Sequence, residues 1–119
     1  MGSDADDKIR EIVELAKLYD IYGDMLSDHN RVVFEDYVLN NYSLGEIAGE
    51  VDISRQGVRD IVVRCSGKLR GYEEKLGFLK KINETEAALN EMEDMINAGN
   101  TDPEIILYCV RKARETLVK

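Results

Sequence analysis

The residues best suited to do chemistry in this chain are basic and lie between positions 54 and 72. Five basic side chains occur there against one acidic residue, Asp60: Arg55, Arg59, Arg64, Lys68 and Arg70. Guanidinium groups donate paired hydrogen bonds to guanine and phosphate, and an ammonium group binds phosphate as a point charge. The segment is therefore a candidate nucleic-acid interface.

The rest of the chain is acidic, which confines any such contact to this segment. The sequence has 16 Lys and Arg against 24 Asp and Glu, a formal net charge of -8 and a pI near 4.7. A globally anionic chain repels phosphate, so a polyanion has to be met by a local cationic face.

Other reactive side chains are few. The only histidine, His29, follows Ser27 and Asp28, but three consecutive residues cannot fold into a catalytic triad, and the sequence has no glycine-rich phosphate loop. Cys65 and Cys109 occur singly, without C-x-x-C spacing, and are interpreted as small buried hydrophobic residues. We therefore expect a non-enzyme with no catalytic residue, no metal site and no cofactor.

The length of 119 residues supports one compact domain plus an appendage. No run approaches the roughly 18 apolar residues of a membrane span, and the acidic residues 1–7 do not resemble a signal peptide. We expect a cytoplasmic protein with no membrane contact.

Helical periodicity and capping signals predict an all-α fold, since no segment alternates as a strand does. One helix is expected over about 7–22, ended by Gly23. A second should begin at Ser27 or Asp28 and carry an apolar stripe of Val32, Val33, Tyr37 and Val38. The last helix should run to about Val118 from a capping box at Thr101-Asp102-Pro103-Glu104.

Residues 43–72 have the pattern of a helix-turn-helix. Ser43 and Glu46 form a capping box that starts a short helix, and Asp52 occupies the turn position, whose backbone is left-handed. Ala48 is the small residue at the helix crossing, and the apolar positions are Ile47, Ile53, Val58 and Ile61.

In such a motif the second helix presents its first turns to the major groove. We expect base contacts from Arg55, Gln56 and Arg59 and phosphate contacts from Arg64 and Lys68, with Ser54 at the start of the helix completing the interface. The alternative is that the motif only packs three helices and that its basic side chains are solvated or meet an acidic protein.

Beyond Arg55 a helical spacing continues to about Asn97, and a bend or break is expected between Gly67 and Gly77. We divide the chain into a helical domain, 1–76, and an extension, 77–119. The extension carries more apolar surface than a three-helix core can cover, so we expect a homodimer. The alternative is that this stripe is intramolecular core. The predicted dimerisation residues are Leu76, Leu79, Ile82, Leu89, Met92 and Ile96.

Three segments carry a family resemblance: 42–50 with 53–60, the run Tyr72-Glu73-Glu74-Lys75-Leu76-Gly77, and 18–26. Together they resemble the YlxM family of small bacterial helical proteins. The resemblance implies a protein encoded beside the signal recognition particle GTPase, which regulates or assists that pathway by contacting the particle's RNA or protein. It also implies a helix-turn-helix similar to the promoter-reading domain of sigma factors.

Three functions follow from these observations. The first is a nucleic-acid-binding regulator that contacts DNA or the particle's RNA. The second is an adaptor that grips the targeting GTPase without physiological DNA binding. The third, which depends on the sigma resemblance alone, is a role in transcription.

Overall fold

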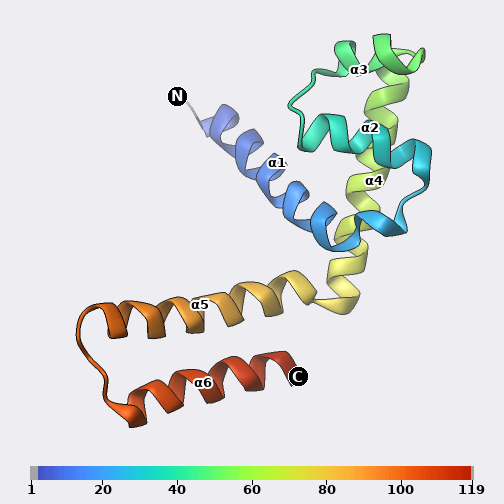
Figure 1. The fold of residues 1–119 in the computed structure, drawn as a ribbon. Coiled ribbons are helices and arrows are strands. Elements are labelled where there is room, and N and C mark those ends of the chain that lie inside the picture. Colours follow the sequence, from blue (N-terminus) through green and yellow to red (C-terminus); the bar gives the residue numbers. More distant parts are fainter. Residues whose placement is uncertain (1–2, 119) are drawn as a thin grey trace. The chain divides into compact units, whose positions relative to one another are not determined.

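The computed structural model describes residues 3–118, which form six α-helices, one 3₁₀ turn and no strand (Figure 1). The helices are α1 (Ser3–Tyr22), α2 (Asp28–Val38), α3 (Leu44–Val51), α4 (Arg55–Leu76), α5 (Phe78–Asn97) and α6 (Pro103–Val118), and the 3₁₀ turn is Gly23–Met25. The predicted all-α class is confirmed. No helix in this part of the chain is both long and apolar enough to cross a lipid bilayer.

The chain divides into two compact units between Leu76 and Gly77. Helices α1 to α4 make up unit 1, and α5 and α6 make up unit 2. Gly77 has φ +66, a left-handed conformation that ends α4 and places Gly77 as the N-cap of α5. The break thus falls at the far end of the predicted interval.

Unit 1 has a core to which all four of its helices contribute. Its largest fully buried side chains are Leu15, Leu18, Tyr22, Val33, Phe34, Ile47, Val58, Cys65 and Leu69. On α2 the buried positions are Val33, Phe34 and Val38, whereas Val32 is 55% exposed. The predicted stripe was wrong at Val32, because Phe34 supplies the larger apolar surface and turns the helix so that Val32 faces solvent.

Two tyrosines at the end of α1 tie unit 1 together. Tyr19 packs against Phe34 with ring centroids 5.8 Å apart, and its hydroxyl donates to Glu35 Oε2 at 2.9 Å. Burial raises the pKa of the Tyr19 hydroxyl above its ordinary value. Tyr22 packs against Tyr72 and donates to Glu73 Oε1 at 2.7 Å, so the end of α1 is joined to the end of α4.

Unit 2 is an antiparallel hairpin of α5 and α6 (Figure 1). Pro103 is the first residue of α6, and Asp102 Oδ1 accepts from the Glu104 amide at 3.0 Å. The predicted Thr101 cap is therefore replaced by Asp102, one residue nearer the helix. The buried residues of the hairpin are Ala88, Cys109 and Ala113. Cys65 and Cys109 are both free and buried, as predicted.

The predicted dimerisation residues fall in three environments. Ile82, Leu89 and Ile96 are exposed on α5, Leu79 and Met92 are half-buried, and Leu76 is exposed at the end of α4 in unit 1.

Candidate nucleic-acid interface

The first helix of the helix-turn-helix, α3, begins and ends as the sequence predicts. The Ser43 hydroxyl accepts from the Glu46 amide, and Glu46 Oε1 accepts from the Ser43 amide, both at 3.1 Å. Asp52 ends α3 in the left-handed region, at φ 56 and ψ 43. Ile47 is completely buried, whereas Ala48 is half-buried. Ile47 therefore fills the core position that the sequence predicts for it.

Ser54 positions the start of α4. Its hydroxyl accepts from the Gly57 amide at 2.9 Å, which satisfies one of the free amides of the first turn. A Cβ at position 57 would lie 3.2 Å from the same oxygen, so glycine leaves the cap undisturbed. Ser54 is exposed, and its observed role is to cap the helix whose side chains form the candidate interface.

The predicted basic residues of α4 divide between two sides of the helix. Successive residues turn by about 100°, so Arg55 and Arg59 lie about 40° apart on one flank, whereas Arg64 and Lys68 lie about 140° and 180° from Arg59. The positive charges of Lys68 and Arg64 act on the thiol of Cys65, whose pKa is nevertheless raised by burial. All four basic side chains are exposed.

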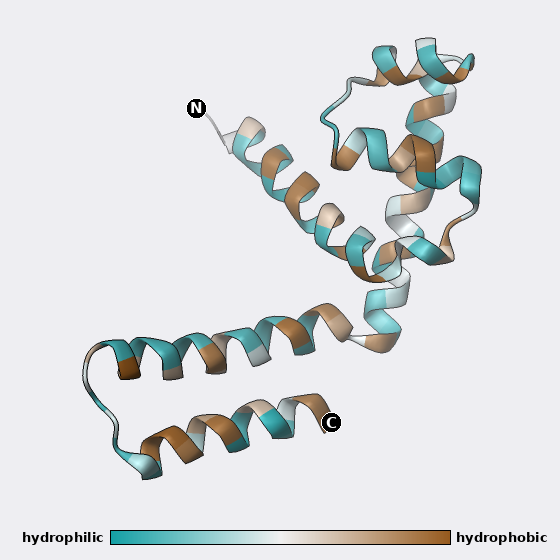
Figure 2. Cartoon of the chain, in the orientation of Figure 1, coloured by the Kyte–Doolittle hydropathy of each residue, from teal (hydrophilic) through white to brown (hydrophobic). Residues whose placement is uncertain are grey.

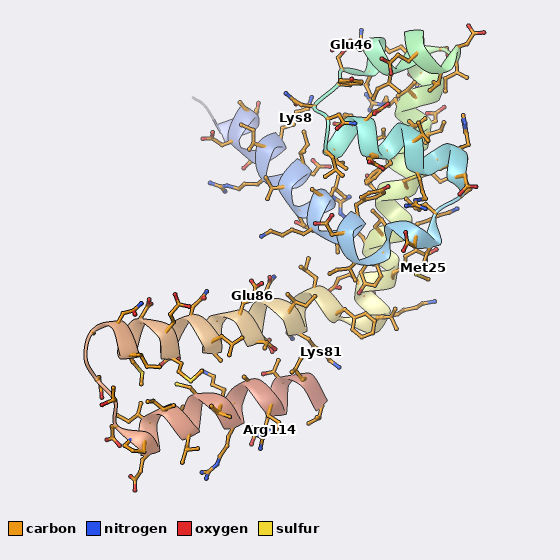
Figure 3. The ribbon with its side chains drawn as sticks, viewed as in Figure 1. Lys8, Met25, Glu46, Lys81, Glu86 and Arg114 are labelled. Carbon is orange, nitrogen blue, oxygen red and sulfur yellow. The ribbon has the colours of Figure 1, made fainter. Side chains whose placement is uncertain are left out.

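Residues from α1 and the end of α4 extend the flank that carries Arg55 and Arg59. Lys8, Arg59 and Arg70 line an open hollow of about 400 Å³. Lys8 and Arg55 line a neighbouring hollow of about 310 Å³, beside the segment that precedes α3. Lys8 is labelled in Figure 3. We call these residues, Lys8, Arg55, Arg59 and Arg70, the basic flank.

Sequence reasoning missed two members of the basic flank. Arg70 follows Arg59 by eleven residues, about three turns of helix, which is a signal that was available in the sequence. Lys8 could not be found in this way, because its place depends on how α1 packs in unit 1.

The basic flank is largely free of acidic partners. Among the residues that the structure describes, Lys8, Arg55 and Arg59 form no salt bridge, whereas Arg70 lies 3.5 Å from Glu11. Gln56, a predicted base contact, donates its amide to Asp60 Oδ1 at 3.0 Å and lines an open hollow together with Arg55 and Arg59. The groups ready to meet an anion are therefore Lys8, Arg55 and Arg59.

Residues suited to other chemistry are not gathered in this way. Within residues 3–118 no three His, Cys, Asp or Glu side chains form a group that could hold a metal ion. His29 is exposed in the first turn of α2.

Comparison with known proteins gives a family match over most of the chain. Residues 9–106 match the family UPF0122, described as "Putative helix-turn-helix protein, YlxM / p13 like". A UPF0122 protein of Thermoanaerobacter sp. (strain X514) is 45% identical over 101 residues, which cover 82% of this chain and 86% of the relative. A UPF0122 protein of Listeria welshimeri is 40% identical over 83 residues, covering 70% and 76%.

Proposed function

The chain belongs to the UPF0122 family of YlxM/p13-like helix-turn-helix proteins, and from this premise we propose that it is a non-catalytic regulator that binds nucleic acid through the basic flank. The observation that carries the proposal is the exposure of Arg55 and Arg59, without a salt bridge in the described part of the chain, on the first turns of the second helix.

The side chains of the basic flank are suited to contact the edge of a base and the phosphates beside it. Arg55 and Arg59 are one helical turn apart, and each guanidinium can donate two hydrogen bonds to guanine O6 and N7. Lys8, on α1, is suited to a phosphate because an ammonium group has no preferred direction of approach. Arg64 and Lys68 face another side of α4 and are left outside the interface in this proposal.

The ligand we propose is duplex DNA or the helical RNA of the signal recognition particle. Such a role would place the protein in the cytosol and uses neither a metal nor a cofactor. Binding by one chain should be weak, because the net charge of -8 opposes the approach of phosphate.

The test is fluorescence anisotropy at low salt with labelled duplex DNA and with the particle's RNA. We expect the double variant Arg55→Ala/Arg59→Ala to lose about tenfold or more in affinity, since each bidentate contact contributes about 1–3 kcal/mol. The matched control, Arg64→Ala/Lys68→Ala, removes the same charge from the other side of α4 and should lose about threefold or less.

Two outcomes would refute the proposal. Absence of binding by the unaltered protein to both ligands would remove the function. Equal losses in the two double variants would show that only the net charge matters and that the basic flank is not the interface.

A second candidate function is an adaptor that contacts the GTPase of the signal recognition particle. It is favoured by three exposed apolar side chains of unit 1, Ile9 and Val13 on α1 and Val63 on α4, which are 60%, 48% and 61% exposed; Val63 lines the same hollow as Lys8, Arg59 and Arg70. Nucleic acid offers such side chains few apolar partners, whereas a protein surface buries them. Co-purification with the GTPase that survives nuclease and is lost in Val13→Glu would support the adaptor.

A further inference from the structure

The hairpin of unit 2 has a very small core of its own. In residues 77–118 the buried residues are Ala88, Cys109 and Ala113, all of them small. Two helices of this length bury too little apolar surface to hold together firmly in isolation. Apolar side chains are nevertheless plentiful along α5 and through the first half of α6 (Figure 2).

The exposed apolar side chains of α5 form a straight line. Ile82, Leu89 and Ile96 follow one another at intervals of seven residues and are each between 41% and 47% exposed. Leu89 is one residue beyond the buried Ala88, so the line lies about 100° from the contact with α6.

Two exposed apolar side chains of α6, Leu107 and Leu117, lie on the same side of the hairpin as this line. They share the flank of α6 that carries the half-buried Val110, one residue beyond the buried Cys109. Because the two helices are antiparallel, the same sense of rotation from their shared contact leads to one face of the hairpin. We call Ile82, Leu89, Ile96, Leu107 and Leu117 the apolar face.

The opposite side of the hairpin carries a polar hollow as well as the exposed Ile105 and Tyr108 of α6. The hollow is lined by Lys80, Lys81, Glu84, Lys112, Glu115 and Thr116, together with Gly77. It also gives the register of the hairpin, because it brings Glu84 level with Lys112. The apolar face holds the larger share of the exposed apolar residues, which is the arrangement of a helix pair that packs against another layer.

We propose that the apolar face is covered by the apolar face of a second copy of this chain, giving a four-helix bundle with a two-fold axis parallel to the helices. In this arrangement each α5 packs across the α6 of the partner. Leu89 then lies level with the partner's Leu107, and Ile82 lies within one helical turn of the partner's Leu117. The face is self-complementary in the way that an isologous interface requires.

The charges at the edges of the apolar face favour this axis. Glu86 projects from the side of α5 away from α6, and Arg114 from the side of α6 away from α5 (Figure 3). An axis along the helices brings Glu86 level with the partner's Arg111 and Arg114. The other two-fold arrangement stacks α5 on α5, which sets Glu86 and Glu93 against the same acidic residues of the second copy.

Sedimentation equilibrium on the full chain tests the proposal. We expect the unaltered protein to have twice its chain mass of 13.5 kDa and Leu89→Glu to be monomeric. The matched control is Val32→Glu on α2, which puts the same charge on an apolar residue that is 55% exposed, against 45% for Leu89, and lies outside the face; this variant should stay dimeric. A monomer at high micromolar concentration, or equal loss in both variants, overturns the proposal.

A charge swap keeps the test independent of the folding of Leu89→Glu. Glu86→Arg should weaken the dimer about fivefold or more at low salt, and adding Arg114→Glu should restore it, because the pair then has reversed but matching signs. Failure of the second change to restore the dimer would overturn the proposed axis. The measured quantity is the molecular mass of the protein in the absence of nucleic acid, so the result is independent of whether the basic flank binds nucleic acid.

Discussion

At Gly23 the absence of a Cβ atom allows α1 to continue into the 3₁₀ turn. A Cβ at this position would lie 2.8 Å from Cε1 of Tyr19. The Tyr19 ring cannot easily move aside, because it packs against Phe34 and its hydroxyl is bonded to Glu35. Glycine is required here by the close approach of an aromatic ring to the backbone.

We therefore predict that Gly23→Ala destabilises unit 1 by about 1–3 kcal/mol, as overpacking of a core does. The matched control is Gly71→Ala inside α4, where no atom lies within 4 Å of the added Cβ. That change should stabilise by about 0.5–1 kcal/mol, because alanine favours the helix. Urea unfolding followed by the near-ultraviolet signal of tyrosine would measure both, and the same sign in both variants would contradict the explanation.

At the scale of elements, the start of α3 depends on a reciprocal cap. Ser43 and Glu46 each accept from the other's amide at 3.1 Å, whereas the cap of α2 is a single, longer bond of 3.4 Å from the Asn30 amide to Ser27. Two hydrogen bonds of good length satisfy two amides at the start of α3, whereas the single long hydrogen bond at the start of α2 contributes little.

Ser43→Ala should accordingly lower the free energy of unfolding by about 1–2 kcal/mol, and Ser27→Ala by about 0.5 kcal/mol or less. Both variants lose only a hydroxyl group at an exposed helix start, so packing differs little between them. The denaturant concentrations at the unfolding midpoints of the two variants, compared with that of the unaltered protein, test this prediction. A larger loss of stability in Ser27→Ala than in Ser43→Ala would be inconsistent with the observed caps.

Local signals in the sequence predicted these helix starts and ends well. They predicted poorly the surfaces to which two or more helices contribute. The box at Ser43, the left-handed Asp52 and the break at Gly77 each depend on a few neighbouring residues, and each was visible in the sequence. The prediction that Val32 is buried was wrong because Val32 and Val33 are adjacent on a short helix, so two different apolar stripes are compatible with the sequence. Lys8 reaches the basic flank only through the packing of α1, which no local pattern contains.

At the scale of the whole molecule, a small cationic area has to act on a strongly anionic chain. Only Lys8, Arg55 and Arg59 of the basic flank are without a salt bridge in the described residues, whereas the formal net charge is -8. Added salt screens both the repulsion by the acidic residues and the attraction by the basic flank. The slope of log affinity against log salt measures the number of counterions released, and therefore the number of phosphates that the protein contacts.

We predict a slope of about −1 per chain for log affinity against log salt, since Lys8 is assigned to a phosphate and each phosphate contributes about −0.9 on duplex DNA. Lys8→Ala should remove most of this slope, whereas Arg55→Ala/Arg59→Ala should lower the affinity and leave the slope nearly unchanged, because these two side chains are assigned to bases. Anisotropy titrations at several salt concentrations would give the slopes. An unchanged slope in Lys8→Ala would mean that the phosphate contacts are made elsewhere.

The thiol of Cys65 has a bearing on how α4 can be controlled. It belongs to α4, the helix that carries Arg55 and Arg59, and is buried in the core of unit 1, and burial raises its pKa. Peroxide and disulfides react with thiolate and not with a protonated, enclosed thiol. Oxidising conditions therefore leave the geometry of this helix unaltered for as long as unit 1 stays folded.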